Sequence, residues 1–229
     1  GVRVIFRVVL LIFAIYLVLG LIVDFAVPFI PPAWEDSLAT PIMSEVFSAS
    51  EPSRHFSVDK IQQLLDSLAE LMAGEKRKFY INVIDKDVTN ALALPGGHIV
   101  VYSQLLEQVT SENELAMILA HELGHFAARD HLRGLGRSFL FFIVANFVLG
   151  GQGDTVKHFM NSSGILQNNY SRKQEFAADR YALDLLVKKY GHAGGAVDFF
   201  KRLASKETLP QLTQYLSTHP ASDNRVAEL

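Results

Sequence analysis

The sequence has no cysteine among its 229 residues. This absence excludes disulfide bonds and thiolate metal sites, and it leaves the redox compartment undetermined. An excess of basic residues is also missing, since 21 Lys and Arg stand against 24 Asp and Glu, for a net charge of −3. Without a basic surface to pair with phosphates, nucleic acid is not an expected partner.

Charge is missing altogether from Val8–Val23. With the apolar residues just before it, this run reaches about twenty residues, enough to cross a bilayer as a helix. Arg3 and Arg7 precede the run and Asp24 follows it, so the positive-inside rule places the N-terminus in the cytoplasm. A cleaved signal peptide is the alternative, but no small-x-small cleavage site follows the run. We predict residues 1–24 to be a single-pass anchor, with the rest on the non-cytoplasmic (periplasmic or equivalent) side.

Residues 25–54 contain five prolines and predict a linker or wrapping arm that forms helix poorly. The remaining segment, 55–229, is long enough to bury a core and is predicted to be one domain. Its patterns predict a core helix from Val58 to Met72 and a strand from Lys78 to Ile84. Two further strands are expected around the turn at 95–97.

The most informative string is His121-Glu122-Leu123-Gly124-His125. Two His four residues apart lie on one face of a helix, so both imidazoles can bind one metal ion. Ser111 followed by Glu114 is a capping-box pattern that starts such a helix. Zinc held by three protein ligands keeps a fourth position for water, and Glu122 can take that water's proton during attack on a carbonyl. The motif predicts one zinc ion per chain in a zinc peptidase.

A third protein ligand is needed, and two residues are candidates. His131 has the spacing of the metzincin pattern, but that pattern needs a glycine where Ala128 stands. On a continued helix His131 points to another side, which favours a surface residue or one behind the ligands. Glu175 lies at the start of a second predicted helix and shares a face with Asp179. We therefore favour Glu175 as the ligand, with Asp179 accepting the free N–H of a metal-bound His.

These residues carry a family resemblance. The matching pieces extend over roughly 55–229 and are, in order, 90–101, 120–125, 170–179 and 217–220 with Arg225. The chain resembles the membrane-associated zinc metallopeptidases of gluzincin type that include HtpX, BepA, LoiP and the CAAX prenyl endopeptidases. The resemblance implies His121, His125 and Glu175 as zinc ligands and Glu122 as general base.

The resemblance also implies roles for residues outside the two zinc motifs. His219 would donate a hydrogen bond to the tetrahedral oxyanion, and Asn90 would neighbour the active site. An edge strand beside the metal can bind a substrate backbone by strand addition. We therefore predict substrate contacts from Asn90 and from the turn and second strand of the predicted hairpin, namely Gly96, Gly97, His98, Ile99 and Val100. The expected fold is α+β, a mostly helical zincin-like metallopeptidase domain with a small antiparallel or mixed sheet and one N-terminal transmembrane helix.

A second apolar stretch runs from Phe139 to Leu149. At about eleven residues it is too short to span a bilayer unaided. It predicts either a packed core helix or a segment that docks on the membrane surface and covers the active-site cleft.

The sequence as a whole predicts a membrane-anchored zinc endopeptidase. The family resemblance implies that its substrates are misfolded or membrane-proximal polypeptides and that it acts in envelope protein quality control. Its remaining expected partner is membrane lipid. Two alternatives stay open: a chaperone-like binding module with a structural zinc, and a metzincin-type protease that uses His131.

Overall fold

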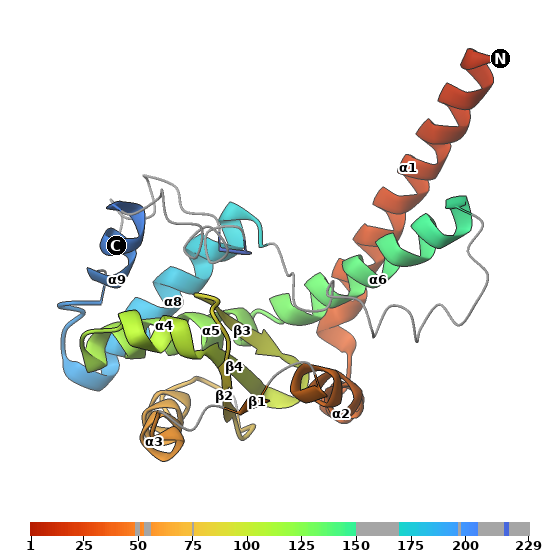
Figure 1. Cartoon of the computed structure of the whole chain (residues 1–229). Coiled ribbons are helices and arrows are strands. Elements are labelled where there is room, and N and C mark those ends of the chain that lie inside the picture. Colours follow the sequence, from red (N-terminus) through yellow and green to blue (C-terminus); the bar gives the residue numbers. More distant parts are fainter. Residues whose placement is uncertain are drawn as a thin grey trace.

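The computed structural model describes residues 1–48, 51–52, 56–74, 76–149, 170–196, 198–205 and 218–219. Within these ranges the chain is mostly helical around one small sheet, which confirms the predicted α+β class (Figure 1). The elements in chain order are α1 (Val2–Ala26), η1 (Val27–Phe29), α2 (Pro32–Ser48), β1 (Glu51–Pro52), α3 (Val58–Ala69), β2 (Tyr80–Asp85), β3 (Ala91–Leu94), η2 (Pro95–Gly97), β4 (His98–Tyr102), α4 (Ser103–Gln108), α5 (Glu112–Ala127), α6 (Asp130–Leu149), α8 (Arg172–Tyr190) and α9 (Asp198–Ser205).

The sheet is mixed and has the strand order β1-β2-β4-β3. β2 and β4 run parallel, with Tyr80 opposite His98. β3 and β4 form the predicted hairpin, in which Leu94 lies opposite His98 and Ala91 opposite Val101. This order makes β4 a central strand and leaves β3 at one edge.

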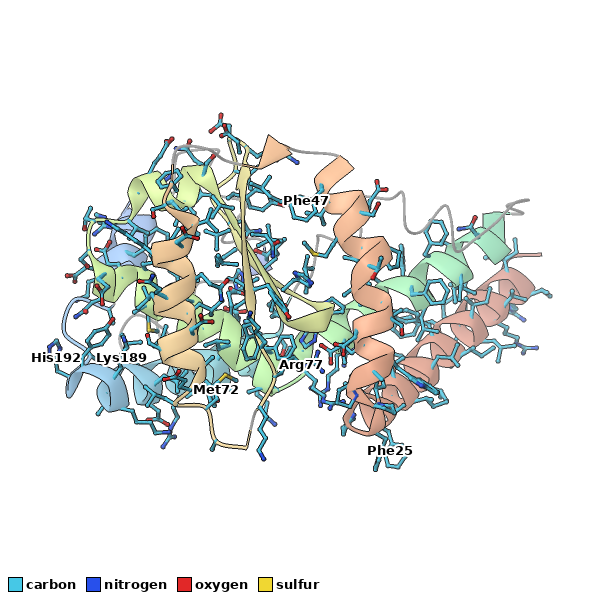
Figure 2. All side chains as sticks on the ribbon, turned by 90° about the horizontal axis from the view of Figure 1, so that it is seen from below. Phe25, Phe47, Met72, Arg77, Lys189 and His192 are labelled. Carbon is cyan, nitrogen blue, oxygen red and sulfur yellow. The ribbon has the colours of Figure 1, made fainter. Side chains whose placement is uncertain are left out.

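Both faces of the sheet are covered. Because side chains alternate along a strand, Ile99 and Val101 of β4 join the larger core cluster with α3, α5 and α8. Val100 and Tyr102 point the other way and join a second cluster with α2, against which the first half of α6 packs. Figure 2 shows α3 and α2 on opposite sides of the strands.

The Pro-rich segment corrects one expectation. Instead of an irregular arm, residues Pro32–Ser48 form helix α2. Pro32 stands at the first position of the helix, where a missing N–H costs nothing. Pro41 stands inside the helix, but Ile42 and Val46 beside it are buried in the second core cluster, and this packing outweighs the lost hydrogen bond. The segment does lie against the catalytic part of the chain, and its boundaries with the neighbouring domains remain a prediction.

Helix α1 projects from the body, and α6 runs along it (Figure 1). None of the α1 residues is buried, and Val2–Phe29 are long and apolar enough to cross a membrane. Within the second apolar stretch, Phe139 packs against the second core cluster. Phe141 is 65% exposed and meets Tyr16 of α1 edge to face. The stretch is therefore partly core and partly an exposed surface beside α1.

Candidate metal centre

Two helices supply the candidate ligands, and both begin where the sequence predicts. Ser111 caps α5 by accepting the Glu114 N–H at 3.3 Å. The reciprocal half of the predicted capping box does not form, because the Glu114 carboxylate accepts from Thr110 N at 2.7 Å instead. At α8 the box is complete, since Ser171 and Gln174 bond each other's backbone N–H. These caps fix the starting points of the helices that carry the ligands.

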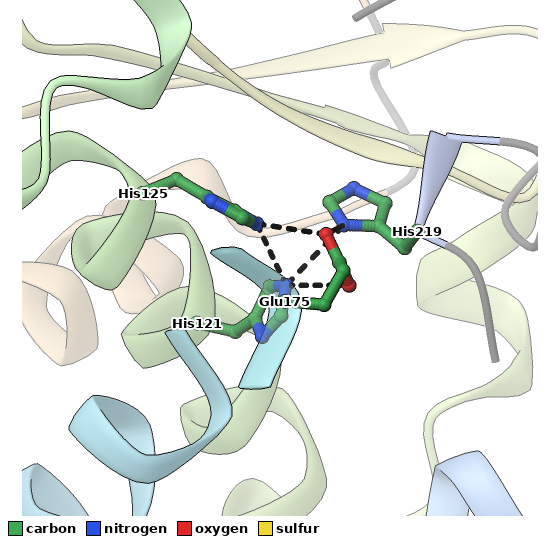
Figure 3. A group of neighbouring side chains, drawn as sticks. All are labelled: His121, His125, Glu175 and His219. Atoms are coloured by element: carbon green, nitrogen blue, oxygen red, sulfur yellow. Dashed lines mark hydrogen bonds and ion pairs between the residues drawn. The ribbon is translucent and has the colours of Figure 1, made fainter. Parts of the chain in front are cut away.

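The donor atoms of His121, His125, Glu175 and His219 converge on one point (Figure 3). His121 Nε2 lies 3.0 Å from His125 Nε2, and Glu175 Oε1 lies 3.2 Å from His125 Nε2. His219 Nδ1 is 3.1 Å from Glu175 Oε1 and 3.2 Å from His121 Nε2. All four residues are buried, and their donor atoms lie within 4.8 Å of one another.

This spacing suits a metal ion. Two donors bound at about 2.1 Å to a tetrahedral zinc lie about 3.4 Å apart. The short contacts in the group run from 3.0 Å between the two His nitrogens to 3.6 Å between His121 Nε2 and Glu175 Oε2 and bracket that value, while all donor atoms lie within 4.8 Å of one another. Three imidazoles and one carboxylate are also ligands that zinc accepts. The residues present therefore fit the metal that the sequence motif implies.

Glu122 stands beside the group but outside it. Its side chain is buried, and neither carboxylate oxygen has a hydrogen-bond partner among the described residues. His219 Nε2 lies 3.6 Å from Glu122 Oε1. A buried carboxylate that makes no hydrogen bond is costly, and such groups occur where catalysis needs them.

Two carboxylates contact the Nδ1 atoms of His121 and His125, the ring nitrogens that face away from the donor group. Asp179 Oδ1 accepts from His121 Nδ1 at 2.9 Å, as the sequence predicts for that residue. Asp130 Oδ2 accepts from His125 Nδ1 at 3.1 Å. Both Nε2 atoms face the donor group, and a proton donated from each Nδ1 to its carboxylate leaves Nε2 as the atom that can bind a metal.

The close packing of charges shifts the pKa values of the group. Burial lowers the pKa of His121 and outweighs the neighbouring carboxylates, which raise it. For His125, hydrogen bonds to Asp130 and Glu175 overcome burial and raise the pKa to about 9. The surrounding imidazoles hold the pKa of Glu175 far below its ordinary value, although burial alone raises it. Glu175 is therefore anionic at neutral pH.

Asp130 and Tyr170 were not predicted. Tyr170 stacks on the His125 ring with a centroid distance of 3.8 Å. A signal for Asp130 existed in the sequence, because a metal-bound His needs an acceptor and Asp130 follows His125 by five residues. Tyr170 had no comparable signal, since its contact depends on how α8 is placed against α5.

His131 occupies a different place from either prediction. Helix α5 ends at Ala127, and Arg129 adopts a left-handed φ of 57°, so the predicted continuous helix is wrong. His131 does not join the donor group; its Nε2 donates to Glu35 Oε1 at 3.1 Å. The expectation of a surface residue is also wrong, because His131 is only 1% exposed and stacks on Phe126. His131 is therefore not placed to serve as the third ligand of a metzincin-type site.

Asn90 supports the segment that carries His219. The Asn90 side-chain oxygen accepts from Thr218 Oγ1 at 3.3 Å. The Thr218 carbonyl in turn accepts from Tyr170 N at 3.3 Å. Asn90 is buried, so its observed contacts are to the protein itself.

The predicted substrate contacts at the hairpin need correction. Ile99 and Val100 lie in the central strand β4, whose backbone groups pair with β2 and β3, so strand addition there is wrong. Gly96 donates its N–H to Glu35 of α2 at 3.2 Å. The hairpin tip is thus covered by α2 and lies at the far end of β3 from Ala91, whose carbonyl approaches His219.

The other two residues of that expectation are also placed away from the donor group. Gly97 packs tightly on the backbone of Lys78, where an added Cβ would lie 2.5 Å from the carbonyl oxygen. His98 stacks on Tyr80 at the groove between α2 and the sheet. Among the described residues, the edge strand of the sheet next to the donor group is β3 (Ala91–Leu94).

Two His on one helix, a Glu on a second helix and a buried Glu beside the first His define a metal site of the gluzincin class. Comparison with known proteins agrees. Residues 57–229 match the model of Peptidase family M48, and the chain belongs to this family.

Three relatives illustrate the match. The chain is 28% identical to mitochondrial metalloendopeptidase OMA1 of Schizosaccharomyces pombe, covering 82% of this chain and 56% of the relative. It is 26% identical to metalloendopeptidase OMA1, mitochondrial, of Homo sapiens, covering 86% and 40%. Identity to metalloprotease LoiP of Escherichia coli is 32%, covering 78% and 71%. The chain thus spans about half the length of the OMA1 relatives.

Proposed function

We propose that this chain is a zinc-dependent endopeptidase in which His121, His125 and Glu175 hold the metal and Glu122 is the general base. The observation that carries the proposal is the set of buried donors at zinc spacing, with a Glu122 carboxylate beside it that has no hydrogen-bond partner among the described residues. Membership of family M48 and relatives named as metalloendopeptidases support the reaction class.

In the proposed reaction, Glu122 and His219 have separate roles. Zinc, when bound, supplies Lewis-acid chemistry and lowers the pKa of water to about 7. Glu122 accepts the proton of the attacking water on a carboxylate oxygen and delivers it to the leaving amine. His219 Nε2, 3.6 Å from Glu122 Oε1, is the proposed donor to the developing oxyanion.

We propose that a polypeptide substrate pairs with β3, the edge strand of the described sheet. This strand lies next to the donor group, because the Ala91 carbonyl is 3.5 Å from His219 Nε2. Strand addition binds a backbone without demanding a particular sequence, which suits misfolded or membrane-proximal proteins and a role in envelope protein quality control.

Membrane topology is part of the proposal. Arg3 and Arg7 at the start of α1 and Asp24 at its end favour an N-terminus in the cytoplasm and a catalytic domain on the other side. Since the chain has no cysteine, a single cysteine introduced at the exposed position Glu107 is the only labelling site and reports on which side of the membrane the catalytic domain lies. We expect Glu107→Cys to react with an impermeant maleimide from outside the cell membrane, and Arg3→Cys to be protected. The reverse pattern would invert the topology.

The experiment for the reaction pairs zinc content with casein digestion. We expect Glu122→Gln to keep one zinc per chain and to lose activity by about a hundredfold or more. Glu175→Ala should lose zinc, whereas His131→Ala should retain its zinc stoichiometry at saturating metal. Full activity in Glu122→Gln would refute the proposed mechanism.

One observation favours a second function, that of a binding module with a structural zinc. His219 supplies a fourth donor, and sites with four protein ligands are typically structural. The buried, unbonded Glu122 argues against this reading, since a structural site has no use for a base there. His219→Ala distinguishes them: a structural site loses zinc, whereas the proposed peptidase keeps it and loses turnover.

A further inference from the structure

The connection, defined here as residues 128–129 between α5 and α6 together with the first two residues of α6 (130–131), contacts three separate parts of the molecule. Its Asp130 is buried and accepts from His125 Nδ1 at 3.1 Å on one carboxylate oxygen. On the other oxygen it accepts from Gln174 Nε2 at 2.7 Å. Gln174 is the residue before Glu175, so one carboxylate links a candidate ligand on α5 to the start of the helix that carries another.

The residues on both sides of Asp130 hold the N-terminal arm, defined here as η1 and α2 (27–48). Arg129 donates to the carbonyl oxygens of Val27 at 3.0 Å and Ile30 at 2.6 Å, at the turn between η1 and α2. His131 donates to Glu35 of α2 at 3.1 Å. The connection therefore binds the metal group on one side and the arm on the other.

Glu35 is the arm's main attachment. Its buried carboxylate also accepts from Gly96 N at 3.2 Å and pairs with Arg77 at 3.0 Å (Arg77 is labelled in Figure 2). Burial raises the pKa of Glu35, but His131 and Arg77 outweigh it and lower the pKa below the ordinary value. Because a buried charge is stable only with its partners in place, removing Glu35 frees both His131 and the hairpin tip.

Backbone geometry shows that the connection depends on these attachments. Arg129 has a φ of 57°, a left-handed conformation that residues with a side chain rarely adopt. Such a conformation persists where surrounding contacts hold it, and the two carbonyl bonds to the arm are such contacts. The same turn aims Asp130 at His125.

We propose that the arm is a positioning element for the metal site. Through Arg129 and His131 it sets the connection in the conformation that presents Asp130 to His125, so that metal retention depends on residues that never touch the metal. This inference rests on the proposed function, because it requires His125 to be a metal ligand. Glu35, Arg129 and Asp130 are then positioning residues, not catalytic ones.

The test measures how fast zinc leaves the full chain in detergent micelles when excess chromogenic chelator is added. We expect Asp130→Asn, Glu35→Ala and Arg129→Gly each to lose zinc about tenfold faster or more, the range for residues that support metal ligands. Glu35→Gln, which keeps an oxygen acceptor, should be intermediate. The double variant Glu35→Ala/Asp130→Asn should lose zinc no faster than Asp130→Asn, because both act through one contact.

Two matched controls separate positioning from general destabilisation. Glu114→Gln removes another buried carboxylate paired with an Arg, at the opposite end of α5. Arg137→Ala removes a contact of α6 with Asp24 of α1 but leaves the connection intact. Both should lose zinc within about twofold of the wild-type rate, even where melting temperature falls.

The outcomes are distinct. A wild-type rate in Glu35→Ala together with fast loss in Asp130→Asn overturns the role of the arm. A rate in Glu114→Gln that rises as much as in Glu35→Ala assigns the effect to lost stability and also overturns it. Failure of the wild type to bind zinc at all would instead overturn the proposed function.

Discussion

At the scale of single residues, the donor group depends on carboxylates that accept hydrogen bonds from the Nδ1 atoms of its imidazoles. Asp179 accepts from His121 Nδ1 at 2.9 Å, and both side chains are buried. We expect Asp179→Asn to weaken zinc binding by about 10- to 100-fold, since the anionic acceptor is lost. Asp184→Asn, an exposed carboxylate on the same helix, is the control. Competition with a chelator of known affinity measures both, and equal affinities would show that Asp179 does not orient His121.

Gly124 contributes through the side chain it lacks. An added Cβ would lie 3.0 Å from Ala178 Cα and 3.1 Å from its carbonyl oxygen on α8. The glycine therefore lets helices α5 and α8 approach each other closely.

We expect Gly124→Ala to lower the free energy of unfolding by about 1 to 3 kcal/mol, because α8 must move away to relieve the overlap. Thermal melting measures the loss, and zinc affinity should fall with it as Glu175 moves. At Gly20 an added Cβ meets nothing within 4 Å, so Gly20→Ala serves as the control. Unchanged melting in Gly124→Ala would contradict the packing argument.

At the scale of elements, the start of α5 is tied to α9 by an ion pair. Arg202 donates to both carboxylate oxygens of Glu114, at 2.5 and 2.8 Å. With the bonds from Thr110, it holds the pKa of Glu114 below the ordinary 4.5, although burial raises it.

A group whose pKa is lowered by folding stabilises the fold above its unfolded pKa, and the contribution is lost as pH falls. We expect Glu114→Gln to cost about 2 kcal/mol at pH 7, the size of a charged hydrogen bond. The difference in melting temperature from wild type should narrow below pH 4.5. The control Glu107→Gln, at an exposed position, should melt at the wild-type temperature at every pH. A melting-temperature difference in Glu114→Gln that stays constant with pH would contradict the ion-pair account.

Helix α6 offers a second test at this scale. Phe141 is 65% exposed and lies against Tyr16 of α1, the helix proposed to span the membrane. In liposomes we expect a polarity-sensitive dye on Phe141→Cys to emit as in an apolar medium and to be quenched by lipid-borne nitroxide. The same dye on Phe176→Cys, a 40% exposed site on α8, should report water. Water-like emission at both positions would place α6 outside the bilayer.

At the scale of the whole molecule, the donor group joins segments far apart in sequence. His121 of α5, Glu175 of α8 and His219 are separated by up to 98 residues. Zinc bound by the folded state but not by the unfolded chain raises stability by about 4 kcal/mol when its concentration is a thousand times Kd.

We therefore expect a chelator to lower the melting temperature of the wild type and zinc to restore it. His121→Ala should melt at the lower temperature with or without chelator. Glu122→Gln, which keeps all proposed ligands, should respond to chelator as the wild type does. A wild-type melting curve that ignores the chelator would mean that no metal is held in the folded chain.

The sequence by itself determined the local features. Ser111 and Ser171 mark helix starts through hydrogen bonds within three residues, and the spacing of His121 and His125 fixes their shared face. The apolar run in α1 and the hairpin around Pro95 were likewise readable, because each depends on neighbours along the chain. These features needed only the periodicity of helix and strand.

Tertiary structure alone decided the rest. Whether α2 forms a helix across Pro41 depended on burial against the sheet, and whether β4 could bind substrate depended on the strand order. The end of α5 at Ala127 depended on Arg129 meeting the carbonyls of the arm. In each case contacts between distant segments outweighed a local preference of a few kcal/mol, and local sequence patterns do not encode which segments meet.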